Sequence, residues 1–112
     1  MKAAHLNEMI KGWFIGNFEP SVLCREDFEV AVKHYKAGDR EETHHHRVAT
    51  EITVIVSGDV EMMGRRWAAG EIVVTEPGEA TSFVAITDAV TVVVKTPSVL
   101  GDKYLGSSSP EK

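Results

Sequence analysis

The sequence predicts an all-β protein, a two-layer β-sandwich that closes toward a barrel. Two observations support this class. Apolar stretches of strand length recur along the 112 residues, and turn-forming Gly, Pro, Asp and Ser residues separate them. Such near-regular spacing is typical of sandwiches and barrels. In addition, residues 52–56 and 90–94 carry β-branched side chains on consecutive positions, so both faces of those strands should be covered.

The first half of the chain predicts a weak helix, a strand and a hairpin. The helix signal lies within residues 3–10. Residues 28–35 alternate apolar and polar side chains with the period of two of a half-buried strand, which stops at Gly38-Asp39. The strand 52–56 meets a turn at residues 57–59 and resumes at Val60. That pattern predicts a β-hairpin.

The second half predicts three further strands. Residues 70–76 form a short strand that Pro77-Gly78 ends. Residues 81–96 supply two more strands, divided at Asp88 and stopped by Pro97. The predicted domain therefore spans residues 1–105. The polar segment 106–112 has few groups to bury, and we expect it to be a disordered tail.

Composition excludes several classes of protein. The net charge of −5, with no basic patch, argues against a nucleic-acid partner. No segment reaches the ~18 apolar residues of a membrane span, and the first residues do not form a signal peptide. We expect a cytoplasmic protein without a membrane partner. Cys24 is the only cysteine, so no internal disulfide forms; it is expected to be a small buried residue.

Three histidines stand in a row within the stretch GDREETHHHRVATE, residues 38–51. On a strand, His44 and His46 project to one face and His45 to the other, so His45 should point outward. Glu51 shares their face only if the chain turns within residues 47–50. Two imidazoles and one carboxylate would then form a 2-His-1-carboxylate metal site with open positions. The alternatives are a polar strand end without an ion, and a salt bridge of Glu51 with Arg47 or Arg65.

This stretch resembles the first sequence motif of the cupins. Gly38, His44, His46, Glu51 and Gly58 match every fixed position of that motif, which covers about a fifth of the chain. The resemblance implies a jelly-roll β-barrel, also called a double-stranded β-helix. It also implies a metal ion inside the barrel on His44, His46 and Glu51.

The second cupin motif matches less well. Gly70, Pro77 and Gly78 fit, but Thr81 occupies the place of the fourth ligand histidine. The resemblance places Thr81 at the cavity, and we expect Thr81, Ser82 and Glu79 to contact the substrate at its lip. His34, on the strand that enters the first motif, is the remaining candidate for substrate binding. Lys95 is expected to be a surface residue.

The resemblance implies two main functions. The first is a metal-dependent enzyme with Fe, Mn, Ni or Zn that acts on a small oxygen-bearing metabolite, in the manner of cupin isomerases, epimerases or dioxygenases. The second is a small-molecule-binding cupin without catalysis, whose metal is weak or absent because of Thr81. A structural cupin with a packed interior is a third reading. The apolar segment 11–23 needs a cover, and we expect a homodimer.

Overall fold

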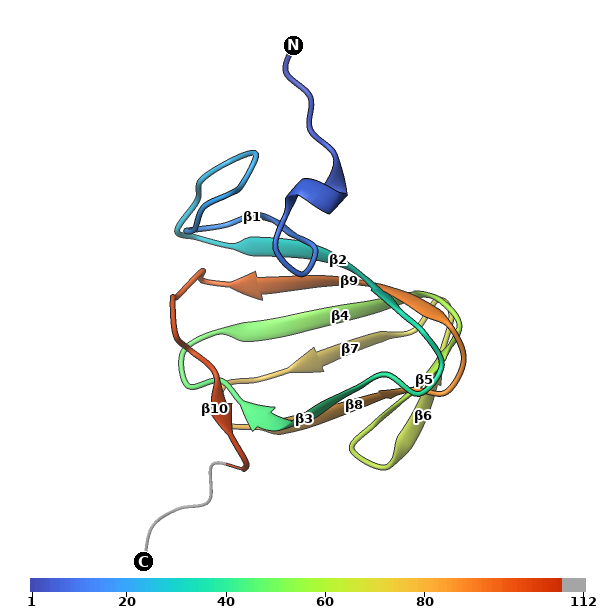
Figure 1. The fold of residues 1–112 in the computed structure, drawn as a ribbon. Coiled ribbons are helices and arrows are strands. Elements are labelled where there is room, and N and C mark those ends of the chain that lie inside the picture. Colours follow the sequence, from blue (N-terminus) through green and yellow to red (C-terminus); the bar gives the residue numbers. More distant parts are fainter. Residues whose placement is uncertain (108–112) are drawn as a thin grey trace, which may run out of the picture.

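The computed structural model describes residues 1–107, and their strands form two five-stranded antiparallel sheets that face each other (Figure 1). The first sheet has the order β1-β2-β9-β4-β7 and the second the order β10-β3-β8-β5-β6. The elements are η1 (Leu6–Glu8), β1 (Trp13–Ile15), β2 (Glu29–Tyr35), β3 (Arg40–His45), β4 (Thr50–Ser57), β5 (Asp59–Met62), β6 (Arg65–Ala68), β7 (Ile72–Thr75), β8 (Ala80–Ala85), β9 (Ala89–Thr96) and β10 (Tyr104–Leu105). The predicted tail falls mainly on residues 108–112, which lie outside the described residues. Within the described residues, no helix has the length and apolarity to cross a bilayer.

The chain changes sheet at almost every connection. From β2 to β10, only the β5–β6 hairpin stays within one sheet. The hairpin predicted between residues 52–56 and Val60 is therefore wrong, because β4 lies in the first sheet and β5 in the second. Gly58 forms this corner with a φ of +87°, and a Cβ there would lie 2.2 Å from the carbonyl oxygen of Asp88. Turn residues predict that the chain reverses direction. They do not predict whether the strand after the turn pairs with the strand before it.

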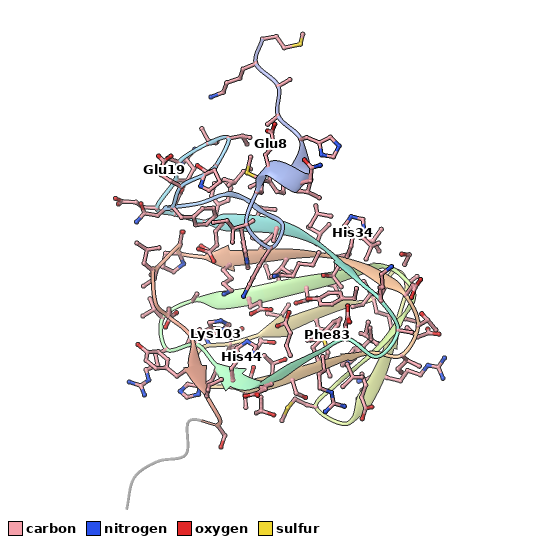
Figure 2. All side chains as sticks on the ribbon, in the orientation of Figure 1. Glu8, Glu19, His34, His44, Phe83 and Lys103 are labelled. Carbon is pink, nitrogen blue, oxygen red and sulfur yellow. The ribbon has the colours of Figure 1, made fainter. Side chains whose placement is uncertain are left out.

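The space between the sheets is filled at one end and open at the other. A buried cluster of Ile55, Val60, Met62, Phe83, Ala85 and Ala89 forms the core. Figure 2 shows Phe83, a member of this core, on the right, and His44 and Lys103 on the left, nearer to β10. His44 therefore lies away from this packed core, in the wall of a cavity, while His45 and His46 are buried beside it.

The outer face of the first sheet is apolar. Val54 and Val92, in the middle of that face, are only half-buried, and Val56, Ile72 and Val74 are exposed. Both faces of these strands were expected to be covered. Within the described chain, only the inner face is. Cys24, expected to be buried, is exposed, because it lies in the loop between β1 and β2 rather than in a strand.

Candidate metal centre and cavity

The two histidines of the motif lie at the end of β3. His44 is paired with Thr81 of β8, and His46 follows the last residue of the strand. A register irregularity between Glu41 and His44 adjusts the direction of the side chains, as β-bulges commonly do near functional sites. The rings of His44 and His46 meet edge to face, with centroids 5.2 Å apart, and both are buried.

Glu51 reaches the same point from the opposite sheet. It lies at the start of β4, and one of its carboxylate oxygens is 3.5 Å from Nδ1 of His46. The other oxygen accepts a hydrogen bond of 3.3 Å from the Thr53 hydroxyl, which orients the carboxylate. The ligand atoms of His44, His46 and Glu51 all lie within 4.8 Å of one another. Glu51 is five positions after His46, an odd separation that would put it on the other face of a continuous strand. The turn at residues 47–49 brings it to the same site instead.

Asp102 stabilises that turn through hydrogen bonds, and this residue was not identified from the sequence. Its carboxylate accepts hydrogen bonds from the backbone N–H groups of Arg47, Val48 and Ala49, with shortest distances of 2.8, 3.1 and 2.9 Å. Burial alone would raise the pKa of Asp102, but these three donors outweigh it and lower the pKa. The only sequence signal was an acidic residue after a glycine, which resembles any polar loop. Asp102 is 51 residues from Glu51, so its role depends on tertiary folding.

The hydrogen bonds and burial of the two histidines suit a metal site. Nδ1 of His44 donates to the carbonyl oxygen of Glu42 at 2.9 Å, because a carbonyl can only accept; Nε2 is then the nitrogen left to bind an ion when the ring is neutral. Nε2 of His46 is buried and has no hydrogen-bond partner among the described residues. Burial, followed by the charges of Lys95 and His44, lowers the pKa of His46 to about 4. His46 is thus neutral at pH 7, as a metal ligand must be.

A cavity of about 1090 Å³ adjoins these residues. His44, Glu51 and Thr81 contribute to its wall. So does Tyr35, whose hydroxyl donates to Oε2 of Glu41 at 2.7 Å. Burial and the charge of Glu41 raise the pKa of Tyr35, so this hydroxyl keeps its proton at neutral pH.

The four residues expected to contact substrate are not all at the cavity. Thr81 is buried in its wall, and its hydroxyl lies 3.4 Å from the carbonyl oxygen of Ser82. His34 also borders the cavity, although its side chain is exposed. Ser82 does not line the cavity, and its hydroxyl accepts from the Met63 N–H at 3.1 Å. Glu79 also lies elsewhere, and its carboxylate accepts from the backbone N–H of Glu76 at 2.8 Å.

His45 does not point into solvent as predicted. It faces away from His44 but is buried, with its ring stacked on Tyr104 at 5.5 Å. Its Nδ1 donates to the carbonyl oxygen of Gly106 at 2.8 Å. The short strand β10 pairs with β3 and covers this face, an arrangement that the local sequence of β3 does not encode.

Lys95 also differs from the expectation of a surface residue. Its side chain is 18 % exposed and lines the cavity. The competing salt bridges of Glu51 do not form among the described residues. The guanidinium of Arg47 lies 3.8 Å from the ring centroid of Tyr104, and that of Arg65 lies 3.9 Å from that of Trp67.

Comparisons with known proteins identify the fold. No family model and no curated protein sequence matches the chain. Among solved structures, a protein with a double-stranded β-helix domain from Klebsiella pneumoniae superposes with a TM-score of 0.70 at 24 % identity, over 77 % of this chain and 75 % of that one. The DMSP lyase DddQ from Ruegeria pomeroyi gives 0.68 at 21 % identity, over 87 % and 51 %. A cupin-superfamily sugar phosphate isomerase from Silicibacter pomeroyi gives 0.59 at 20 % identity, over 62 % and 50 %.

These similarities confirm the predicted fold: the chain adopts the cupin, or double-stranded β-helix, fold. The chain spans only about half of the lyase and of the isomerase. The cupin neighbours include enzymes of different reaction types, and a common fold does not select among reactions. The chemistry of the site itself must therefore indicate the function.

Proposed function

We propose that the protein binds a divalent transition-metal ion through His44, His46 and Glu51 and uses it to bind and transform a small oxygen-bearing metabolite. The observation that carries this proposal is the buried Nε2 of His46, which has no hydrogen-bond partner among the described residues. A buried nitrogen without a partner costs free energy. A metal ion held together with His44 and Glu51 would satisfy it.

The donor set suits Fe, Mn, Ni or Zn, since imidazole and carboxylate ligands serve all four. With three protein ligands, a bound ion keeps coordination positions open and polarises the oxygen of a substrate. In the same cavity, Tyr35 keeps its proton at neutral pH and donates it in a hydrogen bond to Glu41, so this pair can position an oxygen-bearing substrate. The pair does not choose between isomerisation or epimerisation and dioxygenation, because a phenol with a raised pKa is a poor acid.

A second candidate function is binding without catalysis. Thr81 favours it, because the cupin resemblance puts a fourth histidine ligand at that position. Thr81 is buried beside the site, opposite His44. A hydroxyl is a poor ligand for a borderline metal. In this case the ion would be weakly held or absent, and the barrel would bind a small ligand through its cavity.

Metal titration tests the first function. We expect the untagged, chelator-treated protein to bind one divalent ion per chain in calorimetric titrations with Mn²⁺, Ni²⁺, Zn²⁺ and anaerobic Fe²⁺. His46→Ala and Glu51→Gln should each weaken binding by about 100-fold or more, since each removes one of three protein ligands. His34→Ala is the matched control, because His34 is an exposed histidine outside the ligand set. A wild type that takes up none of these ions would contradict the proposal.

Thr81→His separates the two candidate functions. If Thr81 faces the bound ion, a histidine there adds a fourth ligand, and we expect binding tighter by about 10-fold or more. The gain should fade below pH ~6.5, where imidazole becomes protonated. A stable Thr81→His variant with unchanged affinity, together with no effect of His46→Ala, would leave the ligand-binding function. Overpacking would instead appear as a loss of ~1–3 kcal/mol in the free energy of unfolding.

A further inference from the structure

We infer that the cavity contains an anion-binding subsite formed by Lys33 and Lys95 beside Trp13, and that the metabolite bound there carries a carboxylate or phosphate group. The inference deepens the proposed function, because the subsite lies in the same cavity as the candidate metal ligands. It concerns different residues and can be tested without metal.

The two lysines approach one aromatic ring from neighbouring strands. Lys33 lies on β2 and Lys95 on β9, and both line the cavity. Lys95 pairs with Glu29 of β2. Trp13 of β1 pairs with Ala31, which lies midway between Glu29 and Lys33 on that strand. Nζ of Lys33 is 5.2 Å from the ring centroid of Trp13, and Nζ of Lys95 is 5.0 Å away. The indole thus brings two ammonium groups to one part of the wall.

The positive charge at this wall is only partly neutralised. Lys33 is half-buried, its Nζ donates to the carbonyl oxygen of Lys11 at 3.2 Å, and no carboxylate lies within ion-pair distance of it among the described residues. Burial lowers its pKa, Glu41 opposes this, and the charges of Lys95 and Lys103 lower it further. Glu41 is held by Tyr35 instead. Ammonium groups that repel one another in a cavity are stabilised when an anion binds between them.

Lys95 connects this wall to the candidate metal ligands. It lies directly opposite Glu51 in the β4–β9 register, and its charge contributes to the lowered pKa of His46. Its own carboxylate partner, Glu29, is 3.8 Å away and also accepts a short hydrogen bond of 2.6 Å from Ser98. One small molecule can therefore place an anionic group at the lysines while its remaining oxygens face His44 and Glu51, which line the same cavity.

Trp13 provides the signal for a direct test. The chain has two tryptophans, so Trp67→Phe leaves Trp13 as the only one. We expect metal-free Trp67→Phe protein to show a saturable change in fluorescence with inorganic phosphate, with succinate, or with both, at constant ionic strength. The preferred anion identifies the group. Lys33→Met in this background should weaken binding by about 10-fold or more, since a charged hydrogen bond is lost.

Two further variants define the outcome. Lys36→Met is the matched control, because Lys36 is exposed just beyond β2 and does not line the cavity; its affinity should equal that of the parent. Lys33→Gln can still donate to Lys11 but carries no charge, so it should lose affinity even if Lys33→Met folds poorly. Absence of saturable binding, or equal affinity in parent and Lys33→Gln, would overturn the inference. Anion binding by a protein that takes up no metal would refute the proposed function and leave the subsite standing.

Discussion

At the scale of single residues, His46 combines a buried position with a neutral ring. Its side chain is 2 % exposed, and burial is the main reason that its pKa falls to about 4. In the unfolded chain the same imidazole titrates near 6.5. The residue is therefore ready to bind a metal at neutral pH, and it also makes the metal-free fold sensitive to acid.

The pH dependence follows from this difference in pKa. Between pH 6.5 and 4 the imidazole of His46 is protonated in the unfolded state but not in the folded state. The contribution of His46 to stability is therefore fully present above pH 6.5 and is lost as the pH falls toward 4. We expect His46 to account for a loss of at most ~3 kcal/mol in the free energy of unfolding of the metal-free protein. Urea unfolding at pH 7 and at pH 4.5 measures it.

His46→Gln removes the titrating group, so the difference between the two pH values should shrink in this variant. His34→Ala, which changes an exposed histidine, should keep the wild-type difference. An identical pH dependence in the wild type and His46→Gln would show that other groups cause the acid sensitivity.

At the scale of elements, the connection between β3 and β4 decides whether the ligands meet. His46 directly follows β3, and Glu51 is the second residue of β4 in the opposite sheet. Between them, three consecutive N–H groups point to the Asp102 carboxylate. This carboxylate replaces the backbone partners that a tight turn cannot supply to its own amides.

We expect Asp102→Ala to weaken metal binding by about 10-fold, the lower end of the effect of groups that orient metal ligands. It should also cost ~1–3 kcal/mol of stability, because the N–H groups of the turn, including the buried one of Ala49, lose their acceptor. Asp88→Ala is a matched control: Asp88 accepts from the backbone N–H of Ala37 at 2.9 Å, away from the metal ligands. Asp88→Ala should affect stability alone. Equal metal affinity in Asp102→Ala and the wild type would show that the turn forms without the carboxylate.

At the scale of the whole molecule, the outer face of the first sheet lacks a cover within the described chain. Strand register aligns its aliphatic residues in two rows that cross β2, β9, β4 and β7. One row is Val30, Val94, Ile52 and Val74, and the other is Val32, Val92, Val54 and Ile72. Contiguous apolar patches of this kind mark interaction surfaces, and a self-complementary sheet face suits a twofold dimer. We therefore propose that this face, rather than the segment 11–23 alone, forms the homodimer expected from the sequence.

Ile72→Glu tests the dimer. Ile72 is exposed at the edge of this face, so a charge there should leave the monomer folded but oppose burial of the face against a second copy. We expect the wild type to sediment as a dimer and Ile72→Glu as a monomer at micromolar concentration. Ile86→Glu, an exposed isoleucine in the turn between β8 and β9, should remain dimeric. A monomeric wild type would contradict the prediction.

The sequence by itself determined the fold class and the candidate ligands. Side-chain alternation and turn residues are local properties, so they predicted strands close to β2, β4, β7, β8 and β9. The spacing of His44, His46 and Glu51 identified a set that the fold brings within 4.8 Å. The strands and the proximity of these three side chains could be predicted because period and spacing are properties of one stretch of chain.

Only the tertiary structure decided how distant segments combine. The corner at Gly58, the cover of β10 over His45, and the capping of the turn by Asp102 all depend on partners far along the chain. The approach of Lys33 and Lys95 to Trp13 has the same origin. The sequence lists these residues, but which of them become neighbours depends on strand order and on the stacking of the two sheets, which local patterns leave open.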